Sequence, residues 1–60
     1  MALTQERRRE VFAALVAAQD AGLDVVASRK RVAEEHGLTS KQVEKIENEG
    51  LDAQWPPLDG

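Results

Sequence analysis

The stretch RKRVAEEHGLTSKQVEKIEN, from Arg29 to Asn48, decides the fold of this chain. It predicts two helices joined by one tight turn, because apolar residues recur at helical spacing on both sides of a glycine. The residues behind this pattern are Val32 and Ala33 before the turn, Gly37 and Leu38 in it, and Val43 and Ile46 after it. This order is typical of a helix-turn-helix, in which two helices pack at a steep angle.

Two of these residues have specific tasks in such a motif. Gly37 supplies the positive φ angle of the turn at low cost, because glycine has no Cβ. Ala33 lets the two backbones approach where the helices cross. The same packing also serves helical hairpins that bind only protein, so a hairpin without a nucleic-acid role is the alternative.

The N-terminal part of the chain predicts the longest helix, over residues 5–21. Thr4 is a suitable N-cap, and Gly22 is the expected stop. The core positions of this helix recur at helical spacing and are Val11, Phe12, Leu15 and Val16. With the two helices of the motif, it predicts an all-α, three-helix domain over residues 1–50.

We place the second helix over residues 25–36, with Asp24 as its N-cap and Gly37 as its stop. Its expected apolar face consists of Val25, Val32 and Ala33. Ser28 is a rival N-cap, which would shorten this helix by one turn.

We place the third helix over residues 39–49. Thr39 is its N-cap, and Gln42 has the spacing of a capping box, in which each side chain bonds to the backbone N–H of the other residue. Gly50 is the expected stop. After it, residues 51–60 contain two prolines and predict a non-helical, extended tail that packs on the domain.

The segment Trp55-Pro56-Pro57-Leu58 in this tail has two interpretations. As structure, Trp55 covers a core that is poor in aromatic residues. As function, the segment is a short extended motif that docks in a groove of a partner. Replacing Trp55 with alanine separates the two, because a loss of stability indicates the first and a loss of partner binding alone indicates the second.

Composition excludes most chemistry. Sixty residues allow one small domain, which buries about 60% of the surface that the unfolded chain exposes. The chain has no cysteine, which excludes disulfides, thiol catalysis and cysteine-based zinc sites. His36 is the single histidine, so neither a metal site nor a catalytic triad is expected around it. We therefore expect no enzyme activity, no cofactor and no metal.

The charge balance and the termini bear on partners and location. The chain has a formal net charge of −3 and a pI of about 5.0, which counts against tight non-specific DNA binding. No apolar run approaches the roughly 20 residues of a membrane span, and the N-terminus has no signal-peptide pattern. We expect a soluble, cytoplasmic protein without a membrane partner.

The motif resembles the C-terminal helix-turn-helix, region 4, of bacterial sigma factors of the sigma-70 family. The resemblance lies in EEHGLTSKQVEKIENEGL and covers roughly residues 28–51, under half of the chain. The matching positions are the turn Gly37-Leu38-Thr39, then Val43, then Lys45-Ile46-Glu47, then Gly50-Leu51. In that family the module recognises the promoter −35 element and touches the polymerase. The resemblance therefore implies a DNA-binding transcription regulator, or alternatively a module that docks on RNA polymerase or another regulator without reading DNA.

The chain departs from the family where bases are read. The family usually places Arg, Glu and Arg after the turn threonine, and another Arg after the following Val. Here Ser40, Lys41 and Gln42 follow the threonine, and Glu44 follows Val43. The arginines that bind guanine edges or phosphates are missing, so the resemblance implies the scaffold rather than the −35 target.

Double-stranded DNA is the first expected partner, with the third helix in the major groove. The candidate DNA contacts are Thr39, Ser40, Lys41, Gln42, Glu44, Lys45 and Asn48 on this helix, and Arg29 and Lys30 on the second helix. Lys41 and Lys45 suit guanine or phosphate, Glu44 suits cytosine N4, and Arg29 and Lys30 suit the DNA backbone. The alternative is a solvated face with local pairs worth a few tenths of a kcal/mol.

Two further expectations concern the arrangement of partners. Acidic residues crowd the far end of the third helix, so DNA should approach from the Thr39 end. Helix-turn-helix proteins often dimerise, and the alanine-rich face of the first helix is a candidate surface for a homodimer.

Overall fold

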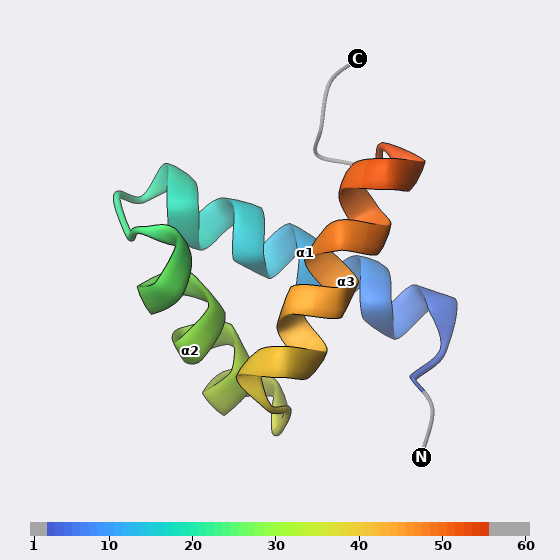
Figure 1. Cartoon of the computed structure of the whole chain (residues 1–60), viewed down its shortest axis with the longest axis horizontal. Helices are drawn as coiled ribbons and strands as arrows, with labels where there is room; N and C mark the ends of the chain where they lie inside the picture. Colours follow the sequence, from blue (N-terminus) through green and yellow to red (C-terminus); the bar gives the residue numbers. More distant parts are fainter. Residues whose placement is uncertain (1–2, 56–60) are drawn as a thin grey trace.

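The computed structural model describes residues 3–55, which form three helices: α1 (Gln5–Asp20), α2 (Val25–His36) and α3 (Ser40–Ala53). The predicted all-α, three-helix architecture is confirmed. α3 crosses over α1, α2 lies to one side of both, and every pair of helices is in contact (Figure 1). A three-residue turn between α2 and α3 places the start of α3 beside the end of α2.

Side-chain caps fix where the first two helices begin. The Thr4 hydroxyl accepts from the Arg7 N–H at 3.1 Å, and the Asp24 carboxylate accepts from the Ala27 N–H at 2.7 Å. Both predicted N-caps are confirmed. The helix end at Gly22 is confirmed too, because this glycine has a φ of 108° and follows the C-cap of α1.

Ser28 as a rival N-cap is wrong. Asp24 caps α2 one turn earlier, so Ser28 lies inside the helix and is fully buried. Its hydroxyl donates to the Val25 carbonyl at 2.9 Å and accepts from Gln19 Nε2 at 3.2 Å. This serine therefore joins α2 to α1.

The turn between α2 and α3 has the predicted chemistry. Gly37 has a φ of 67°, and the Leu38 N–H donates to the Ala33 carbonyl at 2.8 Å, which closes the end of α2. The capping box is complete: the Gln42 N–H donates to the Thr39 hydroxyl at 3.1 Å, and the Thr39 N–H donates to Gln42 Oε1 at 2.9 Å. Both helix ends at the turn are thus satisfied locally.

Gly50 as the stop of α3 is wrong. α3 continues to Ala53, and the buried Gly50 lies against the ring of Phe12 in α1, where a Cβ would overlap the ring. The glycine is needed for this close approach and not for a turn. α3 ends instead at Gln54, with a φ of 55°, and the Trp55 N–H donates to the Gly50 carbonyl at 3.0 Å.

The core combines one face of each helix with Trp55. Its buried members are Val11, Phe12, Leu15, Val32, Ala33, Val43, Ile46 and Trp55, and Val16 and Leu38 pack against them. Val25 was expected in this core, but it is 46% exposed because it is the first residue of α2 and the buried face begins only at Ser28.

The residues after Gly50 differ in part from the predicted tail. Residues 51–53 belong to α3, so the non-helical segment begins later than predicted. Trp55 is buried, and its ring meets that of Phe12 edge to face, with centroids 6.1 Å apart. This confirms the structural interpretation of Trp55. The prediction for residues 56–60 lies outside the described residues.

Candidate nucleic-acid interface

The outer face of α3 carries the candidate contacts. Val43 and Ile46 are buried in the core. Because of the helical periodicity, the residues on the opposite side of α3 face solvent. The exposed candidates on α3 and at its start are Thr39, Ser40, Lys41, Gln42, Glu44, Lys45 and Asn48. The structure thus brings all seven of them to the accessible surface of one helix.

Thr39 and Gln42 have a structural task on this surface. The Thr39 hydroxyl and Gln42 Oε1 both bond to backbone N–H groups in the capping box. They set where α3 begins and how its first turn is presented. Ser40, Lys41 and Glu44 follow directly and are free of this task.

Two lysines form the basic part of the face. Lys41 and Lys45 are four residues apart and exposed, and within residues 3–55 neither has an ion-pair partner. Lys30 of α2 is exposed as well. It lines, together with Val26 and Lys41, a shallow hollow between α2 and the first turns of α3. The predicted basic contacts from two helices are therefore close together.

Arg29 lies differently from the prediction. It was expected to meet the DNA backbone, but its Nε and Nη2 bond to Glu47 Oε1 at 2.8 and 2.6 Å. Its Nη1 lies 3.6 Å from Glu44 Oε2, and only 25% of the side chain is exposed. α2 and α3 cross where Glu47, one turn after Val43, faces Arg29. In this structure Arg29 therefore joins α2 to α3.

Glu47 is the centre of a polar network that sequence reasoning missed. Its side chain is only 12% exposed, and Oε2 accepts from Gln19 Nε2 at 3.3 Å, the same amide that bonds to Ser28. The network joins α1, α2 and α3. The hydrogen-bonded residues of this network are 9 to 28 positions apart in the sequence, so no local pattern predicts their contacts. The only sign of the network in the sequence is that its polar residues have the spacing of core-facing positions.

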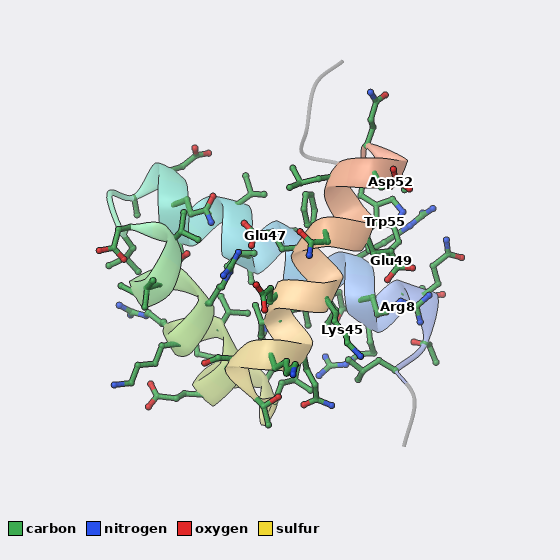
Figure 2. All side chains as sticks on the ribbon, viewed as in Figure 1. Arg8, Lys45, Glu47, Glu49, Asp52 and Trp55 are labelled. Atoms are coloured by element: carbon green, nitrogen blue, oxygen red, sulfur yellow. The ribbon has the colours of Figure 1, made fainter. Side chains whose placement is uncertain are left out.

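The two ends of α3 differ in charge. The C-terminal half of α3 carries Glu47 and Glu49, which Figure 2 shows on opposite sides of the helix, with Glu49 beside Arg8. Arg8 binds both carboxylate oxygens of Glu49, at 2.8 and 3.2 Å. Asp52 is exposed one turn further on, whereas the lysines stand nearer to the start of the helix. The layout agrees with the expected polarity, while the approach of DNA from the Thr39 end stays a prediction.

The described residues were also compared with the requirements of a metal site and of a membrane span. No three metal-ligating side chains come together among residues 3–55, and His36 is the last residue of α2. No helix in the same range has the length and hydropathy of a membrane span.

Comparison of the chain with protein-family models, with curated proteins and with solved structures gives no match in any of the three. The resemblance to region 4 of sigma-70 family factors and the homodimer through α1 therefore stay predictions. Function has to be inferred from the three helices and from the side chains that they expose.

Proposed function

We propose that this chain is a DNA-binding helix-turn-helix module of a transcription regulator, with α3 entering the major groove. One observation carries the proposal. The face of α3 opposite Val43 and Ile46 exposes Lys41 and Lys45, and no carboxylate of the described residues forms an ion pair with either lysine. A helix of this kind fits the width of the major groove, where lysine reaches guanine edges and phosphates.

The charge near the turn supports DNA binding although the whole chain is acidic. The charged residues on the surface of the shallow hollow between α2 and the first turns of α3 are Arg29, Lys30, Lys41 and Glu44. The basic ones outnumber the acidic ones, so this surface is locally positive while the chain carries −3. Local charge governs phosphate contacts, because at 0.1 M salt the interaction between exposed charges more than about 10 Å apart is largely screened.

The test is binding of duplex DNA at several salt concentrations. With roughly three phosphate contacts, affinity for a duplex should fall about 40-fold between 50 and 200 mM salt. The double variant Lys41→Glu, Lys45→Glu should lose binding at all of these concentrations. A matched control is Arg7→Glu with Arg31→Glu, which makes the same charge change on exposed positions of α1 and α2.

Three results of this experiment would contradict the proposal. If no member of a random duplex pool binds, or if binding does not depend on salt, DNA is not the partner. If the control variant weakens binding as much as the α3 variant, overall charge and not α3 is responsible.

A protein-docking role is the second candidate, and the exposed valines of α2 favour it. Val26 is 74% exposed and Val25 is 46% exposed, next to each other in the first turn of the helix. A partner such as RNA polymerase or another regulator would cover them without reading DNA. Capture of a partner protein that survives nuclease treatment and is lost on Val26→Ser supports this role.

A further inference from the structure

The two carboxylates that face Arg29 are not equivalent. Glu47 accepts one hydrogen bond from Arg29 Nε and one from Gln19 Nε2, forms a close ion pair with Arg29 Nη2, and has a side chain that is 12% exposed. Glu44 has a single contact, 3.6 Å from Arg29 Nη1, and its side chain is 50% exposed. The acceptors of Glu47 are thus used inside the protein, whereas those of Glu44 are open to a ligand.

The position of Glu44 limits what that ligand can be. Glu44 lies on the outer face of α3 next to Lys45 and one turn from Lys41, the residues proposed to contact DNA. A carboxylate near phosphates is unfavourable unless it accepts a hydrogen bond from a base. In the major groove the donors are the amino groups of cytosine and adenine, and on adenine the neighbouring N7 acceptor repels a carboxylate. Cytosine N4 has no such neighbour.

Arg29 adds a second condition that favours this contact. Because two of its nitrogens are fixed by Glu47, the third is held at a constant place beside Glu44. The guanidinium therefore restricts the rotamers of Glu44 and offsets part of its charge. Both effects lower the cost of bringing a carboxylate into the groove.

We propose that Glu44 selects a C·G base pair by accepting a hydrogen bond from cytosine N4, and that Arg29 acts as a positioning residue for it, anchored by Glu47. This specificity rests on the proposed DNA-binding function. Lys41 and Lys45 then supply affinity on either side of the selected base pair, whereas Glu44 supplies discrimination.

The experiment starts with selection of bound duplexes from a random pool by the unaltered chain. The selected site is then varied one base pair at a time, and the affinity of each duplex is measured. One position should prefer C·G by about tenfold or more over the other pairs. The variant Glu44→Gln should shift that preference toward A·T, because an amide pairs with adenine N6 and N7. Glu34→Gln is the matched control, since it removes an exposed carboxylate from α2 and should leave the preference unchanged.

The role of Arg29 is tested by Arg29→Lys, which keeps the charge but cannot hold both carboxylates in one geometry. The ratio of affinities for C·G and the other pairs should fall at the Glu44 position, with smaller changes elsewhere in the site. Circular dichroism should show that the variant is still helical. A merely structural role of Arg29 would weaken all duplexes equally and leave the ratio as it was.

The outcomes separate this inference from the function on which it rests. If the unaltered chain binds no duplex, the proposed function and the inference both fail. If it binds duplexes, but without a C·G preference that depends on Glu44, only the inference is wrong. If Glu44→Gln shifts the preference and Arg29→Lys does not, Glu44 is the selecting residue and the positioning role of Arg29 is wrong.

Discussion

At the residue scale, Gly50 shows how a single missing methyl group sets the distance between two helices. A Cβ at this position would overlap the ring of Phe12, so the close approach of α1 and α3 there requires glycine. Gly50 is also followed by three more helical residues, so the conformational freedom of glycine is not what the fold uses.

Gly50→Ala should therefore destabilise the protein, against the usual trend for helices. Alanine is favoured over glycine inside a helix by about 1 kcal/mol. The overlap with Phe12 should outweigh this, since overpacking a core costs about 1–3 kcal/mol. Urea denaturation measures the difference in the free energy of unfolding. Asp52→Ala, at an exposed position of the same helix, is the control and should change stability by less than about 0.5 kcal/mol. A more stable Gly50→Ala protein would show that α1 and α3 do not pack this closely.

Trp55 is the second residue on which the core depends. It is 4% exposed, packs edge to face on Phe12, and has the Arg9 guanidinium 5.7 Å from its ring centroid. Trp55→Ala should cost about 3–5 kcal/mol, which is most of the stability of a domain this small. Thermal melting followed by circular dichroism measures the loss, and Trp55→Phe should recover part of it. An unchanged melting temperature would instead favour the docking interpretation of this segment.

At the element scale, the crossing of α2 and α3 depends on the pair Arg29–Glu47 as well as on apolar packing. The guanidinium binds Glu47 with two nitrogens, and Gln19 connects the same carboxylate to α1. At least three quarters of each side chain is buried, so solvent weakens this pair less than it weakens a surface ion pair. The angle at which α3 presents its outer face is therefore set by these polar contacts together with the apolar core.

A double-mutant cycle with Arg29→Met and Glu47→Gln should give a coupling energy of about 1–3 kcal/mol. The reason is that Arg29→Met leaves the mostly buried Glu47 carboxylate with only its hydrogen bond from Gln19, and Glu47→Gln leaves the mostly buried Arg29 guanidinium without its closest counter-charge. The pair Arg31–Glu35 on the surface of α2 is the comparison, with atoms 3.8 Å apart and both side chains more than half exposed. Its coupling should be near zero. Equal coupling energies for the two pairs would mean that Arg29–Glu47 is only a surface ion pair.

The helix starts could be predicted from the sequence because a cap is a local interaction. Thr4, Asp24 and Thr39 each bond to a backbone group three residues later, so nothing distant is needed. The task of Gly50 and the contacts of Arg29 depend on residues of other helices, and glycine or arginine alone does not reveal them. For the same reason the sequence identified which residues of α3 are exposed, but not that Arg29 is held by Glu47.

At the scale of the whole molecule, the proposed function requires an acidic chain to bind a polyanion with one end. The exposed charges along α3 make this possible, because Lys41 and Asp52 are separated by eleven residues, or about 16 Å at 1.5 Å per residue. This exceeds the screening length of about 10 Å at 0.1 M salt. At that salt concentration the two ends therefore act on DNA almost independently.

This separation predicts that equal charge changes at the two ends have unequal effects. Ser40→Lys and Asp52→Asn each raise the net charge by one at an exposed position of α3. Ser40→Lys should strengthen duplex binding several-fold and make the salt dependence steeper by about 0.9, as one more phosphate contact does. Asp52→Asn should have little effect at 0.1 M salt, and a larger one at 0.01 M, where the screening length is about 30 Å. Titrations of both variants at the two salt concentrations check this. A stronger effect of Asp52→Asn at 0.1 M would mean that DNA meets α3 at its C-terminal end, opposite to the end at which Thr39 caps the helix.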